Sequence, residues 1–168
     1  MISKLIEKMI EYEKGCPKRI NHFLKVSYFA KIIAESENLT EMEKTVLETV
    51  TILHDVGIKI SLKKYNSSAG KYQELEGPPI AAKILAERDS PKEIIDRVCF
   101  LIKNHHTYEN IDGIDHQILI EADFIVNIFE EEFDKETVLK IKNNFFKTAS
   151  GKKLLDTLYN SEKEKNHE

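Results

Sequence analysis

The dipeptide His54-Asp55 places an imidazole beside a carboxylate at the end of an apolar helical stretch that begins after Thr40. Neighbouring side chains on a helix point about 100° apart, so such a pair does not normally contact one small ligand. A cation at the end of the helix, where the backbone turns toward Gly57, removes that difficulty. Histidine nitrogen and aspartate oxygen both bind divalent iron, manganese, nickel or zinc. Considered alone, the pair is more often a helix end whose histidine interacts with the helix dipole and whose aspartate is solvated.

Three other places in the chain carry side chains of the same kind. Asp123 lies in the mostly apolar segment 118–129, where a buried carboxylate needs a cation, a proton or a basic partner. His22 has apolar neighbours, and a histidine in such a place is more often a core residue than a ligand. His105-His106 ends another helical segment, where positive charge interacts favourably with the helix dipole. Each of these residues has a structural explanation when it is considered alone.

In chain order, His22, His54-Asp55 and Asp123 form an H…HD…D pattern within residues 17–130. This pattern resembles the HD-domain superfamily of metal-dependent phosphohydrolases. The resemblance implies an all-α bundle with a divalent metal ion in its centre, held by those four residues. It also implies hydrolysis of a phosphate ester or anhydride, and we expect a small phosphorylated substrate, with a nucleotide favoured. The sequence leaves iron, manganese, nickel and zinc equally open as the metal.

The resemblance also bears on the number of ions. His105-His106, followed by Asp112-Gly113, is similar to the HHE…DG stretch of the HD-GYP branch, although Thr107 replaces the glutamate. By this similarity, His105 or His106 would bind a second ion or contact phosphate. Asp55 would then be the bridging carboxylate, and we expect these three residues to be catalytic.

Other family features are missing from this chain. The HD-GYP branch has a histidine just before a proline, where this chain reads Glu76-Gly77-Pro78, so that Glu76 or Glu74 would have to replace it. The GYP residues are absent from 112–116, which argues against cyclic-dinucleotide hydrolysis. Ile58 occupies the place of a glutamate found in members that are nucleoside monophosphatases, so their mechanism is not transferred.

Basic side chains near this pattern are candidates for substrate binding. Arg19 precedes His22 by three residues, so both share a helix face and Arg19 could grip a phosphate bidentately. The alternative for Arg19 is a surface ion pair. Lys59 and Lys71 could reach a phosphate from a polar segment, and the alternative for both is plain solvation.

Helical periodicity predicts the elements that position these residues. The expected fold is all-α, a single-domain HD-domain-like bundle of about six to eight helices over residues 1–160, with a frayed tail at 161–168. We expect residues 59–77 to form a long polar loop, and Pro78-Pro79 to open the helix after it. Expected N-caps are Thr40 with Glu43 as a capping box, Ser90, Asp134 and Ser150.

The composition narrows the functional classes. The 168 residues carry a net charge of −4 without a basic stripe, so we expect no nucleic acid polymer as partner. No apolar run approaches the ~20 residues of a membrane span, and the N-terminus lacks a signal-peptide core. The two cysteines, Cys16 and Cys99, lack CxxC spacing, which is typical of reduced thiols in a cytoplasmic protein. A homodimer is left open.

Two other functions compete with the phosphohydrolase. A non-haem di-iron oxygenase of the HD type would use a similar mixture of histidine and carboxylate ligands. A regulatory module would bind a nucleotide in the same pocket without turnover.

Overall fold

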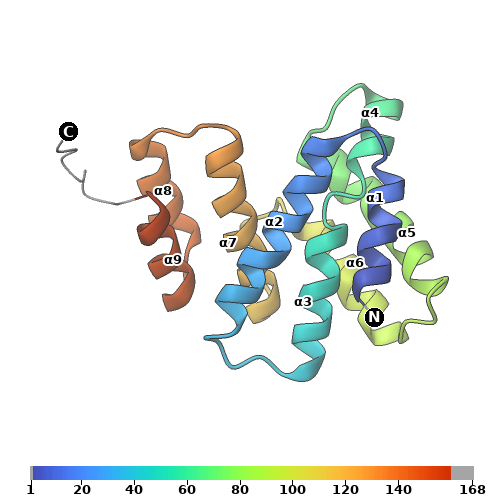
Figure 1. Cartoon of the computed structure of the whole chain (residues 1–168), viewed down its shortest axis with the longest axis horizontal. Helices are drawn as coiled ribbons and strands as arrows, with labels where there is room; N and C mark the ends of the chain where they lie inside the picture. Colours follow the sequence, from blue (N-terminus) through green and yellow to red (C-terminus); the bar gives the residue numbers. More distant parts are fainter. Residues whose placement is uncertain (1, 160–168) are drawn as a thin grey trace.

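The computed structural model describes residues 2–159, and this part of the chain folds into nine α-helices without a β-strand (Figure 1). They are α1 (Ile2–Tyr12), α2 (Pro17–Ala34), α3 (Glu41–Leu53), α4 (Ile58–Tyr65), α5 (Gly70–Ala86), α6 (Lys92–Asn104), α7 (Gly113–Glu130), α8 (Lys135–Phe145) and α9 (Ala149–Tyr159). The all-α class is therefore confirmed, and the helix beyond the expected six to eight is α4. The expected tail at 161–168 lies outside the described residues.

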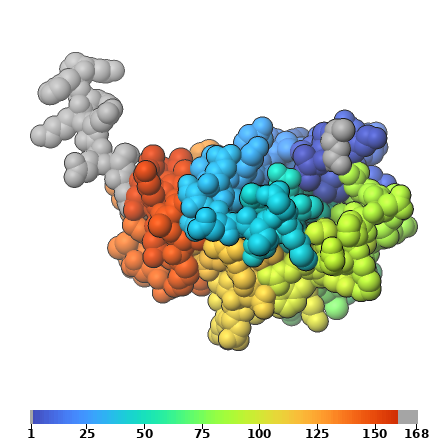
Figure 2. All heavy atoms as spheres, turned by 90° about the horizontal axis from the view of Figure 1, so that it is seen from below, coloured from blue at the N-terminus to red at the C-terminus, as the bar shows by residue number. Residues whose placement is uncertain are grey.

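The central helices are α2, α3 and α7, which pack against one another. Helix α6 lies on α3, and α5 lies on α6, at one end of the molecule, while α8 and α9 pack on α7 at the other (Figures 1 and 2). One cluster of buried apolar side chains continues from Leu5 in α1 to Leu155 in α9. None of the described helices is both long and apolar enough to cross a membrane.

Two of the expected helix caps are confirmed. Thr40 Oγ1 accepts a hydrogen bond from Glu43 N, and the Glu43 carboxylate accepts one from Thr40 N, which completes the capping box of α3. Asp134 caps α8 by accepting a hydrogen bond from Thr137 N. The cap at Thr40 fixes where α3 begins, so that its last turn delivers His54 to the middle of the bundle.

Two other expected caps are wrong. Helix α6 starts after Pro91, which occupies the N-cap position and has no side-chain donor or acceptor, so Ser90 lies one residue too early. Before α9, Thr148 Oγ1 accepts the hydrogen bond from Gly151 N. Ser150 instead donates to Glu37 and fastens α9 to the end of α2. In both places a neighbouring residue, Pro91 or Thr148, occupies the position at the start of the helix that was expected for the serine.

The long polar loop expected at 59–77 is also wrong, because helices α4 and α5 cover most of it. Ion pairing and aromatic stacking hold the two helices together: Lys64 Nζ lies 2.7 Å from Glu76 Oε2, and the rings of Tyr65 and Tyr72 stack with centroids 4.2 Å apart. Many polar residues of this segment thus lie on exposed helix faces, while Ser61 and Gln73 are buried. A composition typical of loops here belongs to helix α4 and the first half of helix α5.

Helix α5 begins at Gly70 and not at Pro78-Pro79, which lie inside it. A proline in a helix interior removes a backbone hydrogen bond and costs about 3 kcal/mol. Close packing of α5 offsets this cost. A Cβ placed on Gly77 would lie 2.6 Å from Ile102 Cγ2 of α6, and one on Gly57 would lie 2.7 Å from the carbonyl oxygen of Gln73.

Candidate metal centre

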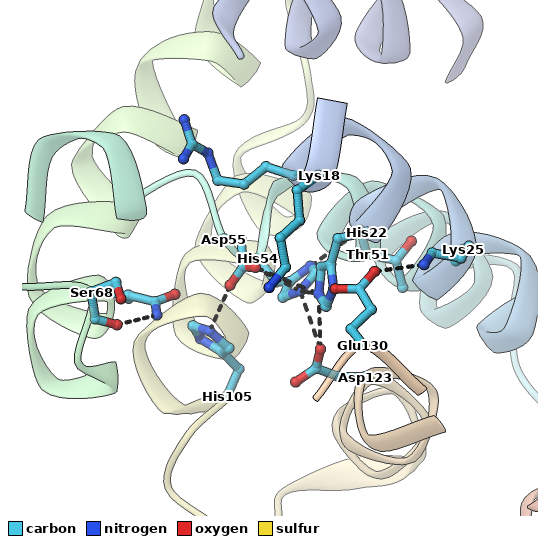
Figure 3. Close-up of polar contacts among 12 residues, drawn as sticks. Lys18, His22, Lys25, Thr51, His54, Asp55, Ser68, His105, Asp123 and Glu130 are labelled. Carbon is cyan, nitrogen blue, oxygen red and sulfur yellow. Dashed lines mark hydrogen bonds and ion pairs between the residues drawn. The ribbon is translucent and has the colours of Figure 1, made fainter. Parts of the chain in front are cut away.

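Three helices bring candidate ligands together in the middle of the bundle (Figure 3). His22 comes from α2, His54 follows the last turn of α3, and Asp123 comes from α7. His22 Nε2 lies 3.3 Å from His54 Nε2 and 3.1 Å from Asp123 Oδ1, and all three side chains are buried. Atoms that each bind one small cation at about 2.1 Å are separated by roughly 3 to 3.5 Å. The spacing of this group, which we call the first ligand group, therefore fits a divalent ion.

Asp55 lies between the first ligand group and two further histidines. Its Oδ2 atom is 3.5 Å from His22 Nε2 and 3.6 Å from His54 Nε2. Its Oδ1 atom is 3.6 Å from His105 Nε2 (Figure 3). Asp55, His105 and His106, the second ligand group, offer ligand atoms that lie within 4.8 Å of one another. One carboxylate thus faces both groups, which is the position that a bridging ligand requires.

Backbone carbonyls fix the orientation of two of these imidazoles. His54 Nδ1 lies 2.9 Å from the carbonyl oxygen of Thr51, and His105 Nδ1 lies 2.6 Å from that of Ile102. Each ring therefore carries its proton on Nδ1, which leaves the lone pair of Nε2 pointing into the centre. The Nε2 atoms of His105 and His106 are buried without a hydrogen-bond partner. A cation would supply the partner that these nitrogens lack.

The electrostatics of the centre also call for positive charge. Burial disfavours the charged form of His22, but hydrogen bonding to Asp123 and the charge of Asp55 outweigh it and raise the pKa of His22 to about 9. Burial likewise opposes the charged forms of the two aspartates, yet the neighbouring imidazoles hold the pKa of each carboxyl well below its usual range. Without a metal, protons on the histidines compensate the negative charge of Asp55 and Asp123. A divalent cation can replace these protons.

A carboxylate outside the ligand set orients His22. Glu130 Oε2 lies 3.1 Å from His22 Nδ1, and Glu130 Oε1 lies 2.6 Å from Lys25 Nζ (Figure 3). A carboxylate that accepts the second ring proton of a ligating histidine fixes the ring and raises its basicity. The sequence interpretation missed Glu130. It lies seven residues after Asp123 on α7, two helical turns along the same face, and this spacing was the available signal.

Comparison with known families decides where the chain belongs. The family model of the HD domain matches residues 19–166, which include all the ligands described above. The chain belongs to the HD-domain family. HD domains are typically metal-dependent hydrolases. Comparison with curated protein sequences gave no match.

A solved HD-domain structure has the same fold. It is the crystal structure of a predicted HD superfamily hydrolase from an uncultured Thermotogales bacterium. The two share 17% sequence identity and superpose with a TM-score of 0.69, over 94% of this chain and 84% of that one. At this identity the likeness concerns the fold, which in both proteins is the helical HD-domain bundle.

A pocket of about 300 Å³ opens onto the HD-domain centre. This volume is at the lower end of the roughly 300 to 1,000 Å³ found for small-molecule sites, which favours a small ligand. A larger hollow of about 600 Å³ lies between α1, α2 and α3, but no candidate ligand lines it. The smaller pocket is lined by ligands from both groups and by polar residues that include Lys18, Arg19, Gln73, Ser68, Asn127 and Glu130.

Three basic residues were expected to bind substrate, and one of them, Arg19, lines the pocket. However, both the Nε and Nη2 atoms of Arg19 lie 2.6 Å from Glu13 Oε2, so an ion pair occupies its guanidinium. Lys59 donates to the carbonyl oxygen of Tyr12, and neither it nor Lys71 lines the pocket. Lys71 lies over an aromatic ring on α5. An ion pair was the alternative expected for Arg19, but its partner, the buried Glu13, could not be predicted because Glu13 lies beyond the break between α1 and α2.

Two pocket residues that the sequence interpretation missed can donate hydrogen bonds to a bound anion. Lys18 lies four residues before His22, lines the pocket, and pairs with Glu131 through its ammonium at 3.1 Å. Asn127 lies four residues after Asp123. Each is therefore one helical turn from a ligand on the same face. That spacing was a usable signal for both residues.

Neither glutamate considered as a replacement for the missing histidine joins the centre. Glu74 accepts hydrogen bonds from His106 N and Thr107 Oγ1. Glu76 binds Lys64 and Tyr65 on the exposed side of α5. These contacts engage both carboxylates away from the ligand atoms.

Replacing Glu130 with glutamine tests its role as a positioning residue. The amide keeps the shape of the side chain but loses the charge that supports the His22 ring. We expect Mn²⁺ affinity to fall by about 10- to 100-fold, as is common for such outer partners. Isothermal titration calorimetry measures the Mn²⁺ affinity of the variant and of wild type. Glu136→Gln, exposed on α8 and paired with Lys140 outside the pocket, serves as the matched control. Equal affinities of Glu130→Gln and wild type would refute the positioning role.

The raised pKa of His22 predicts opposite pH trends for the metal-free and metal-bound protein. A pKa raised from 6.5 to about 9 stabilises the metal-free fold at and below pH 6.5, and this contribution is lost as pH rises to about 9. A metal ion needs neutral His22, so its affinity should rise over the same interval. Urea unfolding in EDTA and Mn²⁺ titrations between pH 6 and 9 check both trends. The interpretation fails if the stability of the metal-free protein rises across this interval.

Proposed function

We propose that this protein is a metal-dependent phosphohydrolase that cleaves a phosphate ester or anhydride of a small phosphorylated substrate, with a nucleotide as the favoured class. The observation that carries the proposal is the position of Asp55. Its two oxygens face different groups of buried histidines, at 3.5 and 3.6 Å on one side and 3.6 Å on the other. A carboxylate between two imidazole-rich groups is well suited to bridging a pair of divalent ions.

The ligand assignment follows from the two groups. His22, His54, Asp55 and Asp123 would hold one ion, and Asp55 with His105 and His106 would contribute to a second. These nitrogen and oxygen donors suit iron, manganese, nickel or zinc. When bound, such an ion lowers the pKa of a water and polarises a phosphoryl oxygen, which promotes hydrolysis of phosphate esters.

Side chains of the pocket would bind and orient the phosphate. Asn127 can donate hydrogen bonds to phosphoryl oxygens beside the ligands, and Lys18 can do so with the ammonium protons that its pair with Glu131 does not use. Glu130 and Glu131 on the same wall repel additional negative charge, which favours a substrate with few phosphates. Arg19 could approach the phosphate only by leaving Glu13.

A phosphatase screen tests the proposal. Protein purified without added metal would be analysed for its metal content. It would then be assayed anaerobically with Mn²⁺, Co²⁺, Ni²⁺ or Fe²⁺ against nucleotides and small phosphate monoesters. We expect metal-dependent release of phosphate that Asp123→Asn abolishes. In a parallel aerobic assay of the protein as purified, oxygen consumption without any phosphate release would favour the oxygenase. Saturable nucleotide binding without product would favour the regulatory module. Either outcome would refute the phosphohydrolase.

A further inference from the structure

Three buried polar atoms in the described part of the chain lack a hydrogen-bond partner: Gln73 Oε1, His105 Nε2 and His106 Nε2. The two nitrogens belong to the second ligand group. The third atom is an amide oxygen on α5, a helix that contributes no residue to either group. Buried acceptors are rarely left unpaired, so each of these three atoms calls for a partner, and Gln73 and His106 line the same pocket.

The amide of Gln73 has a fixed orientation. Its Nε2 donates to the carbonyl oxygen of Ser68 at 2.7 Å, so its Oε1 points away from that carbonyl. The Gln73 side chain is only 6% exposed, and both Gln73 and Ser68 line the pocket that opens onto the centre. In Figure 3, Ser68 lies on the side of Asp55 and His105, opposite Glu130.

The face of α5 that carries Gln73 packs against His106. Gly70 lies one helical turn before Gln73, and a Cβ placed on it would be 2.7 Å from His106 Cγ. Residues three apart share a helix face, so Gln73 projects from the same face as this contact. The pocket is lined by both Gln73 and His106.

Other oxygen donors of α5 are already engaged. Glu74 holds the backbone N–H of His106, and Glu76 is paired with Lys64 and Tyr65. Among these three residues, Gln73 is the one with a buried oxygen that lacks a hydrogen-bond partner.

We propose that Gln73 Oε1 is a ligand of a second divalent ion held by Asp55, His105 and His106. This inference rests on the metal centre of the proposed function and goes beyond it by adding a fourth, neutral oxygen donor. Amide oxygens bind hard cations such as Mn²⁺. Gln73 would thereby supply from α5 the donor that the missing histidine at 76–78 cannot.

A matched pair of variants isolates the oxygen. Gln73→Leu and Gln73→Glu both lose the amide donor to Ser68, but only the glutamate keeps an oxygen and adds a negative charge. Mn²⁺ binding would be measured by equilibrium dialysis and calorimetry. Wild type should bind two equivalents. The leucine variant should weaken the second by at least about tenfold without changing the first, and the glutamate variant should bind both at least as tightly as wild type.

The outcomes separate this inference from the proposed function. Two unchanged Mn²⁺ sites in Gln73→Leu, or equal weakening in both variants, would refute ligation by Gln73 and leave the phosphohydrolase standing. Binding of one equivalent of Mn²⁺ by wild type would likewise refute ligation by Gln73 and leave the phosphohydrolase standing. No binding by wild type would refute the metal centre itself. Circular dichroism checks folding, and if the leucine variant does not fold, tighter second-site binding by Gln73→Glu than by wild type decides in favour.

Discussion

Replacing Asp55 with alanine should remove metal from both ligand groups at once and lower phosphate release by more than about 100-fold. The reason is that its two oxygens face His22 and His54 on one side and His105 on the other. Loss of a residue that hydrogen-bonds to a metal ligand already lowers metal affinity or activity by about 10- to 100-fold. Loss of a ligand shared by two ions should lower both by more. Elemental analysis of the purified variant and a phosphatase assay with saturating Mn²⁺ measure the two effects.

A surface aspartate provides the control for this experiment. Asp96 on α6 is exposed and pairs with Lys92, so Asp96→Ala should keep the metal content and activity of wild type. Circular dichroism should show that both variants retain the helical fold. If Asp55→Ala keeps both its metal and its activity, the centre assigned here is wrong.

The largest stability effect is expected from Glu121→Ala. Glu121 is fully buried in α7, and its carboxylate accepts hydrogen bonds from Gln117 Nε2, Lys147 N, Thr148 N and Thr148 Oγ1. Alanine leaves buried donors without partners and separates α7 from the segment that precedes α9. We expect a loss of about 3 to 5 kcal/mol in the free energy of unfolding, measured by urea denaturation.

An exposed glutamate is the matched control for Glu121. Glu136 on α8 is 76% exposed and pairs with Lys140 one turn along, so Glu136→Ala should change the stability by less than about 0.5 kcal/mol. Equal stabilities of the two variants would show that the Glu121 contacts do not hold α7 to the start of α9.

The helices that carry the ligands could be predicted because their signals are local. The capping box at Thr40 sets the start of α3, and apolar spacing sets α2 and α7. The H…HD…D pattern then pointed to residues that the fold brings within hydrogen-bond distance, such as His22 and Asp123.

Features that depend on contacts between distant segments could not be predicted in this way. Helix α4 is polar and short, and it is held by α5, so its sequence looks like a loop. The pairing of Arg19 with Glu13 depends on how α2 leaves α1. Gln73 is an unremarkable polar residue until the fold buries it without a partner for its oxygen. For Glu130, the seven-residue spacing from Asp123 was a local signal that could have been used.

The most direct test is a crystal structure of the protein grown with Mn²⁺, with anomalous scattering recorded to locate the ion. We expect an anomalous peak within bonding distance of His22, His54, Asp55 and Asp123. Stoichiometric metal bound elsewhere in the crystal, with these four side chains hydrogen-bonded only to one another, would contradict this expectation.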